Sequence, residues 1–225
     1  MKRITIMKKL VIFDLDGTLF NTTVAMSDCG NYALERLGLP LLAPEEYARF
    51  SGGSVRAFVC AALAAAGDGE AVNYDEFWRL YLEKNGTLTE DANVPYEGVE
   101  ALLATLKEKG VCLAVLSNKD EASCIPIVEN AFGKGMFDRI FGGKEGVPAK
   151  PDPTAVFALM GNFGVSAEDC LYVGDTEIDM QTGKNAGIET VAALWGYRTR
   201  ETLEAYAPEY LLAKPSELLS LFDGN

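Results

Sequence analysis

The sequence predicts an α/β fold, a doubly wound and mostly parallel sheet that carries an inserted all-helical cap domain. Three observations predict it. Short apolar runs alternate with stretches of helical periodicity, as in proteins whose parallel strands are covered by helices. Glycine follows the end of several of these helical stretches, where a helix commonly stops. The alternation is interrupted between residues 21 and 85, where only helical patterns occur.

Four apolar runs are predicted to be strands of the core sheet. Each is short and apolar throughout, which is typical of a strand buried on both faces of a parallel sheet. They lie at residues 10–13, 111–116, 170–173 and 190–194. Core helices are predicted at residues 99–109, 154–163 and 178–186, each followed by a glycine. In such a fold, ligands bind outside the carboxyl ends of the strands.

The segment at residues 21–85 is predicted to be a helical cap inserted after the first strand. Helices are expected in it at residues 23–37, 44–50, 55–66 and 74–84. Strand-like runs are missing there, and glycine or proline marks the joints between the helices. Residues 1–20 and 86–225 are therefore expected to form the α/β core, and residues 21–85 the cap domain.

Charge and composition limit the partners and the chemistry. The formal net charge is −13, so neither nucleic acid nor an anionic membrane is expected as the main partner. The chain contains no histidine, which removes Ser-His-Asp and Cys-His catalysis and makes most zinc hydrolase schemes implausible. Any phosphate site in so acidic a protein must carry its own local positive charge.

Cysteine spacing and hydropathy indicate the compartment. The five cysteines form no C-x-x-C pair, so neither a disulfide framework nor a structural zinc site is expected. No apolar run approaches the roughly 20 residues that cross a bilayer. Lys8 and Lys9 interrupt the apolar stretch near the N-terminus, which argues against a signal peptide. We therefore expect a cytoplasmic protein.

Two acidic residues follow the first predicted strand. Asp14 and Asp16 stand at positions i and i+2 directly after this strand, so both can reach one polar site at the sheet edge. A calcium-binding loop fails on spacing, because its sixth position would be Leu19 and its twelfth Ala25. A solvated turn remains the alternative for an isolated Asp-x-Asp.

A second acidic pair follows the strand predicted at residues 170–173. Asp175 leaves this strand, and Asp179 stands four residues further on. A spacing of four puts the second carboxylate one helical turn away on the same face. Helix capping by Asp175 is the alternative interpretation, but it gives Asp179 no role. Both aspartates are therefore expected at the edge of the sheet that the first pair occupies.

Polar and basic residues lie at two further ends of predicted elements. Ser117, Asn118 and Lys119 follow the strand predicted at residues 111–116. A hydroxyl and backbone N–H groups at a strand-to-helix turn can hold a phosphoryl oxygen, although serine and asparagine are also ordinary turn residues. Lys150 stands in a proline-rich segment before a predicted helix. There it is either a fixed point charge aimed at the site or a surface lysine.

The charges of these segments do not balance. Asp14, Asp16, Asp175 and Asp179 would gather four negative charges against the single positive charge of Lys150. Two like charges about 4 Å apart repel by roughly 1 kcal/mol in bulk water and by about 4 kcal/mol at an intermediate effective dielectric constant. Such a cluster needs a divalent cation, and ligands that are all oxygen atoms favour Mg²⁺.

In these four segments the chain resembles the Mg²⁺-dependent phosphatases of the haloacid dehalogenase superfamily, whose four motifs they match in order. The resemblance covers essentially the whole chain, including the helical cap. It implies that Asp14 is the nucleophile, which forms an aspartyl-phosphate, and that Asp16 is the general acid and base. It also implies that Ser117 hydrogen-bonds the transferring phosphoryl group, while Lys150 offsets its charge and orients Asp14.

The same resemblance implies a metal site and a substrate class. Asp14, the backbone carbonyl of Asp16, and Asp175 would bind Mg²⁺, and Asp179 would support the metal site from nearby. Asn118 is expected either to contact the substrate or to support the residues that do. The substrate would be a small phosphorylated metabolite, and the protein a monomer or a small homo-oligomer.

Two features indicate which branch of the superfamily the chain resembles. Dehalogenases of the superfamily lack an aspartate equivalent to Asp16, and the related ATPases carry threonine there, so Asp16 indicates a phosphatase or a phosphomutase. The segment at residues 195–198 resembles the phosphoglycolate phosphatase branch. A β-phosphoglucomutase-type enzyme is the main alternative, because residues 51–56 loosely resemble its substrate loop. Arg56 could recognise an anionic substrate group or be a solvated helix residue. A pyrophosphatase and a non-catalytic binding module are the remaining alternatives.

Overall fold

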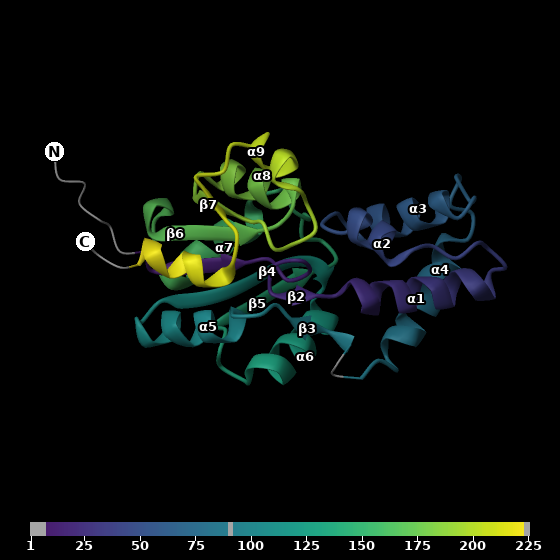
Figure 1. Cartoon of the computed structure of the whole chain (residues 1–225), viewed down its shortest axis with the longest axis horizontal. Helices are drawn as coiled ribbons and strands as arrows, with labels where there is room; N and C mark the ends of the chain where they lie inside the picture. Colours follow the sequence, from purple (N-terminus) through teal and green to yellow (C-terminus); the bar gives the residue numbers. More distant parts are fainter. Residues whose placement is uncertain (1–7, 90–91, 223–225) are drawn as a thin grey trace.

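A computed structural model describes residues 8–89 and 92–222 of the chain. In Figure 1 the chain divides into an α/β part and, to its right, a group of helices that two short strands join to it. Residues 1–7 of the predicted core, most of the stretch weighed above as a signal peptide, lie outside the described residues. Among the helices described, none is both long and apolar enough to cross a bilayer.

The core is a six-stranded sheet in the order β5-β4-β1-β6-β7-β8, and all of its neighbouring strands are parallel. Its strands are β1 (Leu10–Phe13), β4 (Cys112–Asp120), β5 (Arg139–Gly143), β6 (Cys170–Gly174), β7 (Glu189–Ala193) and β8 (Tyr210–Leu212). Phe13 of β1 lies opposite Val115 of β4 and Val173 of β6. The residues that follow β1 and β6 therefore leave the sheet at the same edge. The predicted fold class is confirmed.

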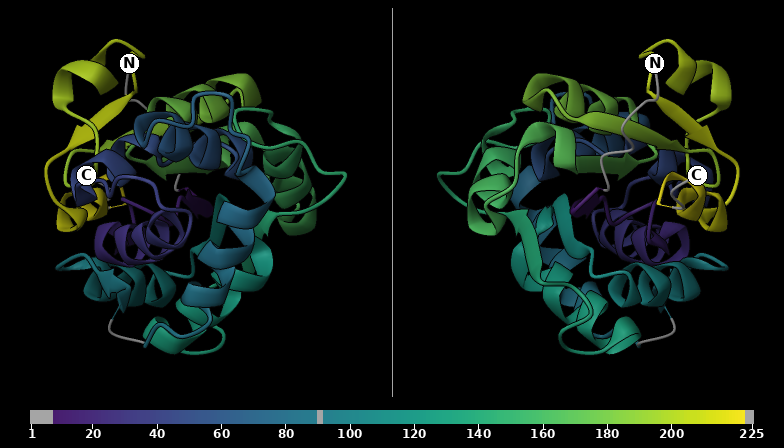
Figure 2. Two further views of the ribbon diagram at one scale, coloured as in Figure 1. Left: turned by 90° about the vertical axis from the view of Figure 1, so that its right-hand side faces the viewer. Right: turned by 90° about the vertical axis from the view of Figure 1, so that its left-hand side faces the viewer.

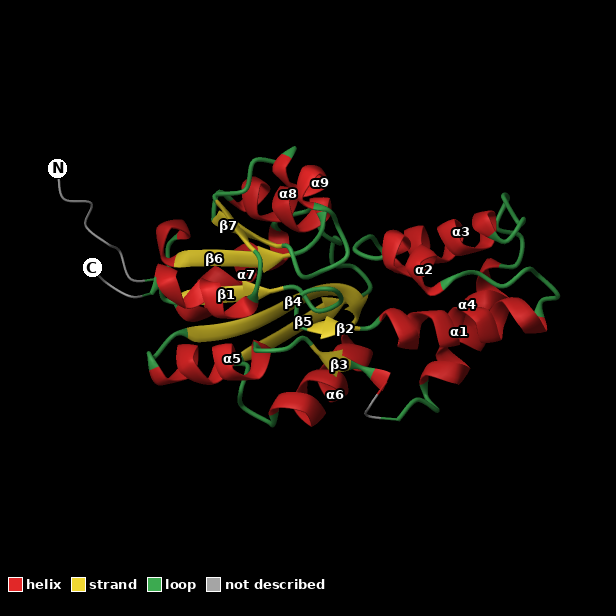
Figure 3. Ribbon diagram, viewed as in Figure 1, coloured by secondary structure: helices red, strands yellow, loops and turns green. Residues whose placement is uncertain are grey.

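Helices cover both faces of this sheet (Figure 3). Val11 and Phe13 of β1 point to one face, which is covered by α5, α6 and η3, and Leu10 and Ile12 point to the other, which is covered by α7 and α8. All four residues are almost fully buried, as the uniformly apolar run predicted. The core helices are α5 (Val99–Glu108), α6 (Glu121–Phe132), α7 (Thr154–Phe163), α8 (Glu177–Ala186), α9 (Arg200–Glu204), η2 (Ala167–Asp169) and η3 (Pro215–Leu221).

The remaining helices, α1 (Thr23–Arg36), α2 (Pro44–Phe50), α3 (Val55–Ala65) and α4 (Tyr74–Asn85), form the cap. They pack around an apolar core of their own, in which Tyr47 and Phe77 are fully buried. The short antiparallel strands β2 (Phe20–Asn21) and β3 (Val94–Pro95) connect the cap to the sheet. Seen from the cap end, the cap helices lie in front of the core (Figure 2). The boundaries at residues 20/21 and 85/86 stay a prediction.

One local prediction was wrong. Residues 117–119 do not form a turn after a strand that ends at residue 116, because β4 continues to Asp120 and α6 begins at Glu121. The pairing of β4 with β5 shifts register between Leu116 and Asp120. At Gly142 of β5, a Cβ atom would lie only 2.4 Å from the Cα atom of Glu121. Because Gly142 has no side chain, β5 can approach the irregular end of β4. Residues 117–119 therefore remain part of that strand.

Candidate active site

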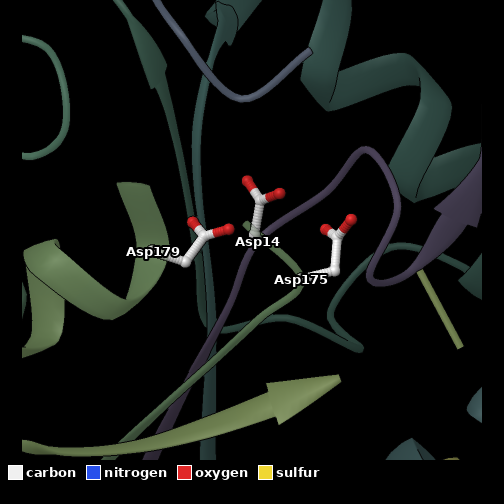
Figure 4. A group of neighbouring side chains, drawn as sticks. All are labelled: Asp14, Asp175 and Asp179. Atoms are coloured by element: carbon white, nitrogen blue, oxygen red, sulfur yellow. The ribbon is translucent and has the colours of Figure 1, made fainter. Parts of the chain in front are cut away.

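Three buried carboxylates meet at the carboxyl edge of the sheet (Figure 4). Asp14 follows β1, Asp175 follows β6, and Asp179 lies in the first turn of α8. In Figure 4 the three side chains point the same way, with Asp14 between the other two. One oxygen atom from each carboxylate lies within 4.8 Å of the others, and the three residues are at most 3% exposed. The predicted convergence of these residues is therefore observed.

The start of α8 fixes the position of Asp179. Thr176 is the N-cap residue, and its backbone N–H and its hydroxyl donate to Asp179 Oδ2 at 3.0 and 2.6 Å. This is a capping box, in which two residues satisfy each other's polar groups at a helix start. The alternative that Asp175 caps the helix is therefore wrong. A Cβ atom at Gly174 would lie 2.3 Å from Asp179 Cβ, so only glycine allows the carboxylate so close to β6.

Lys150 joins two of the carboxylates. Its ammonium donates to Asp14 Oδ1 at 2.6 Å and to Asp179 Oδ1 at 2.7 Å, and the residue is 5% exposed. Asn118 holds its backbone: Lys150 N–H donates to Asn118 Oδ1 at 2.8 Å, and Asn118 Nδ2 donates to the Lys150 carbonyl at 3.2 Å. The alternative of a surface lysine is wrong. Burial alone lowers the pKa of Lys150, but Asp14 and Asp179 raise it well above its usual value, so the side chain is charged.

The carboxylates are not neutralised by this one lysine. Burial, followed by the charge of Asp179, raises the pKa of Asp14 to about 7 despite the opposing effect of Lys150. Burial, followed by the charges of Asp14 and Asp179, raises the pKa of Asp175 well above its usual value. A cluster that resists ionisation on its own is stabilised by a bound cation. The donors are all oxygen atoms, which suits a hard divalent cation such as Mg²⁺.

Hydrogen bonds and close backbone contacts surround the carboxylate of Asp175 on several sides. Thr18 Oγ1 donates to its Oδ1 at 2.9 Å, and the backbone N–H of Tyr197 donates to its Oδ2 at 2.8 Å. A Cβ atom at Gly17 would lie 2.3 Å from Oδ2, and one at Gly196 would lie 2.2 Å from the Cβ atom of Asp175. Gly17 also has a φ of +89°, which L side chains rarely adopt. Both glycines are therefore required to bring their loops against this aspartate.

Asp16 lies beside this cluster with one of its oxygen atoms engaged. Its Oδ1 accepts from Thr22 Oγ1 at 2.7 Å and from Lys119 Nζ at 2.9 Å. The Thr22 hydroxyl also hydrogen-bonds the hydroxyl of Tyr197 at 2.9 Å. Burial lowers the pKa of Lys119, but Asp16 raises it more, so the net shift is upward. Among the described residues, no hydrogen bond to Oδ2 of Asp16 is found, so this oxygen can exchange a proton with a ligand.

No role was predicted for Lys119, Thr22 or Tyr197. Lys119 stands in a segment singled out for its polar residues, but its partner Asp16 is 103 positions away. Tyr197 belongs to the segment that was used only as a marker of the branch, and its backbone and hydroxyl reach Asp175 and Thr22. No local sequence pattern indicates that residues so far apart in the chain contact each other.

A small cavity opens between these residues and the cap. Its core side is lined by Asp14, Asp16, Ser117, Asn118 and Lys119. The cap side is mostly apolar and includes Met26, Val55, Phe58, Trp78, Tyr81 and Leu82. The cavity volume is about 70 Å³, whereas ligand pockets commonly measure about 300–1,000 Å³. With the cap in this position, only a small group fits beside the carboxylates.

Arg56 is not among the residues that line this cavity. It is exposed on α3, its guanidinium lies 5.4 Å from the centre of the Tyr74 ring, and it lines a neighbouring cavity together with Ser117 and Lys150. Its recognition of an anionic substrate group stays a prediction.

Hydrogen bonds between the two parts hold the cap over the site. Asn118 Nδ2 donates to the carbonyl oxygen of Gly52 at 3.0 Å. The guanidinium of Arg198, from the loop after β7, pairs with Glu177 at 2.8 Å. The same guanidinium donates to the carbonyl oxygen atoms at the C-terminal end of α2, those of Ala48 (3.0 Å), Arg49 (3.2 Å) and Ser51 (2.9 Å). The negative end of a helix dipole favours such a cation. One arginine thus connects the cap to the first residue of α8.

Comparison with known families decides the identity of the fold. The family model described as haloacid dehalogenase-like hydrolase matches residues 11–193, which span β1 to β7 and all the aspartates described above. The chain belongs to the haloacid dehalogenase-like hydrolase family. The resemblance noted from the four sequence segments is confirmed.

Two relatives in this family are both named phosphoglycolate phosphatase. The chain is 36% identical to the phosphoglycolate phosphatase of Aquifex aeolicus, over 96% of this chain and 98% of that protein. It is 34% identical to the phosphoglycolate phosphatase of Pseudomonas syringae pv. tomato, over 84% of this chain and 70% of that protein. The prediction of an enzyme of the phosphatase class is confirmed by the family and these relatives.

Solved structures of the family agree with the arrangement of core and cap. A crystal structure from Haemophilus somnus, of a protein predicted to be a phosphoglycolate phosphatase, matches with a TM-score of 0.87 at 26% identity. That match covers 96% of this chain and 98% of the other. A second, from Lactobacillus delbrueckii and with the same provisional assignment, has a TM-score of 0.85 at 27% identity and covers 98% and 100% of the two chains.

Proposed function

We propose that this haloacid dehalogenase-like phosphatase hydrolyses a small phosphate monoester of the phosphoglycolate type, with Mg²⁺, through an aspartyl-phosphate on Asp14. The observation that carries the proposal is the position of Asp14. Its carboxylate lies at the base of a small cavity, 2.6 Å from a buried lysine and within a cluster of buried carboxylates. The names of the relatives support the substrate class.

Asp14 is arranged to act as the nucleophile. Its Oδ1 is held by Lys150, and its side chain lines the cavity, so the other oxygen can attack phosphorus. A carboxylate is a poor nucleophile towards a dianionic phosphate unless that charge is screened. Lys150 supplies one positive charge for this purpose. Asp14, Asp175 and the backbone carbonyl of Asp16 would hold Mg²⁺ with Asp179 in support, and the ion would offset the negative charge of the phosphoryl oxygens.

Asp16 and Ser117 carry the other two roles. Lys119 and Thr22 engage Oδ1 of Asp16, so Oδ2 can give a proton to the leaving oxygen and later take one from the attacking water. The Ser117 hydroxyl oxygen accepts a hydrogen bond from the backbone N–H of Lys119 at 3.1 Å. The hydroxyl can donate its own hydrogen atom to an oxygen atom of the phosphoryl group, whose stabilisation is most of what phosphoryl transfer requires.

Phosphate release from a panel of esters tests this function. The panel contains phosphoglycolate, pyrophosphate and β-glucose 1-phosphate, each assayed with Mg²⁺ and after chelation by EDTA. We expect release from phosphoglycolate that EDTA abolishes and added Mg²⁺ restores, because the carboxylates of the cluster otherwise repel the substrate. Isomerisation of glucose 1-phosphate without net release would instead favour the phosphomutase. The small cavity favours a smaller leaving group than a hexose.

Replacement of Asp16 tests its role in proton transfer. In Asp16→Ala we expect kcat to fall by about 10²–10⁴-fold, the usual contribution of a positioned acid or base. Both formation and hydrolysis of the aspartyl-phosphate are expected to slow, which rapid-quench measurements with radiolabelled substrate can separate. Asp28→Ala, which removes an exposed aspartate of α1, serves as control. An unchanged rate in Asp16→Ala would show that another group transfers the proton.

The proposal also covers the cellular compartment, the oligomeric state and the partners of the enzyme. All five cysteines lie among the described residues and are free, which suits the reducing cytoplasm. We therefore propose a cytoplasmic enzyme that acts on a small phosphorylated metabolite. We further propose that it is a monomer or a small homo-oligomer without nucleic acid or membrane partners, in keeping with its net charge of −13.

A further inference from the structure

Lys119 is the cation that faces the cavity above the nucleophile. Among the described residues that line this cavity, no other lysine and no arginine occurs. Its ammonium donates to Asp16 Oδ1 at 2.9 Å, and no further acceptor for it is found among the hydrogen bonds of the described residues. An ammonium group has three donors, so Lys119 can still bind a ligand. Lys150, in contrast, already donates to two carboxylates.

The position of Lys119 places it beside the leaving group. Asp16 must reach the ester oxygen in order to protonate it, and Lys119 contacts Asp16. The opposite wall of the cavity is formed by apolar cap residues such as Phe58, Trp78 and Leu82. Among the described residues of these walls, no other cation is present to meet a negative charge on the leaving alcohol.

Burial makes a second partner for Lys119 favourable. The lysine side chain is only 18% exposed, and a largely buried cation is stabilised by further hydrogen-bonded counter-charges. A carboxylate on the substrate would bind the donors that Asp16 leaves open.

We propose that Lys119 determines specificity by binding a carboxylate of the leaving alcohol, so that the enzyme prefers phosphate esters with a carboxylate close to the ester oxygen. This inference rests on the proposed function and adds a residue and a chemical requirement to it. Apolar side chains from the cap close the rest of the cavity and limit the length of the alcohol.

The test compares two substrates that differ in the carboxylate. Phosphoglycolate and ethyl phosphate share a two-carbon leaving group, but only the first carries a carboxylate. The variants are Lys119→Gln, whose amide can still donate to Asp16, and Lys119→Met, which has no donor. Lys144→Met is the matched control, because Lys144 is a cation near the site that pairs with Glu121 at 2.7 Å and does not line this cavity.

In both Lys119 variants we expect kcat/KM for phosphoglycolate to fall by roughly 10- to 100-fold more than for ethyl phosphate, the usual effect of losing a charged hydrogen bond. The loss should appear mainly in KM, because the carboxylate is bound before and during the reaction. Inhibition by glycolate should weaken in parallel, while inhibition by inorganic phosphate persists and shows that the site is folded. Lys144→Met should leave the ratio between the two substrates unchanged.

Equal losses on both substrates would overturn the proposal and leave Lys119 as a positioning residue for Asp16. An unchanged ratio with unchanged glycolate inhibition would overturn it as well. Neither result touches the proposed function, which depends on Mg²⁺-dependent release of phosphate from phosphoglycolate by the unaltered enzyme. Failure of that release, with activity on other esters, would remove the phosphoglycolate assignment instead.

Discussion

Asp14→Asn is expected to reduce turnover by at least about 10⁴-fold without weakening the fold. The loss of activity follows from the removal of the nucleophile, since the remaining groups of such a site retain little catalysis alone. The shape of the side chain is kept, and an amide oxygen can still accept a hydrogen bond from Lys150, which now donates to Asp14 at 2.6 Å. The measurement is phosphate release under saturating substrate and Mg²⁺.

The sign of the change in folding stability caused by Asp14→Asn can also be predicted. In the metal-free protein the pKa of Asp14 is raised to about 7, first by burial and then by Asp179, whereas an unfolded aspartate titrates near pH ~4. The folded state thus holds a proton that the unfolded state loses, and stability falls as the pH rises through that window. At pH 8 the full cost of the buried charge is present, and Asn removes it. Urea unfolding at pH 8 without metal should show a midpoint no lower than that of the unaltered protein.

A clear drop of that midpoint would mean that Asp14 is a structural requirement, and its loss of activity would then say little about chemistry. Asp14→Glu is a useful companion, because it keeps the carboxylate but moves it by one methylene in a buried site. We expect it to be nearly as inactive as Asp14→Asn. Substantial activity in Asp14→Asn would exclude this residue as the nucleophile.

The uniformly apolar strands at the centre of the sheet were the most predictable part of the fold. The run at residues 10–13 coincides with β1, and the one at residues 170–173 differs from β6 by one residue. Both are buried on both faces, so every position carries the signal. The strand β5 (Arg139–Gly143) was missed, because it lies at the edge of the sheet, is mostly half-buried or exposed, and contains two glycines.

The candidate site likewise contains some residues that could be predicted from the sequence and others that could not. Aspartates that follow a buried strand could be found from the sequence, because the parallel topology brings strand ends to one edge. The pairing of Lys119 with Asp16, and the contacts of Arg198 with the cap, depend on how distant segments dock. Residues that act through such contacts have no local pattern, and the three-dimensional structure is needed to find them.

Lys150→Met is expected to lower the free energy of unfolding by about 3–5 kcal/mol in the metal-free protein at pH 8, the usual cost of breaking a buried ion pair. The Lys150 side chain is 2% exposed and lies between the side chains of Asp14 and Asp179, which are 4% and 0% exposed. Without it, two buried carboxylates face each other with no counter-charge. Lys134→Met is the control, because the Lys134 side chain is 86% exposed and such changes usually alter stability by less than about 0.5 kcal/mol.

The double variant Lys150→Met with Asp14→Asn separates charge from packing. If the cost of Lys150→Met comes from unpaired carboxylates, it should be smaller in the Asp14→Asn background, where one carboxylate fewer lacks a counter-charge. Contacting residues commonly show coupling of about 0.5–3 kcal/mol, and we expect a value in that range. Added Mg²⁺ should recover part of the stability of Lys150→Met and less of that of the double variant, since a cation replaces the lost charge only where carboxylates remain. Additive effects, with no response to Mg²⁺, would show that Lys150 supports the site by its volume, and its proposed role in screening the phosphoryl charge would then lose its main support.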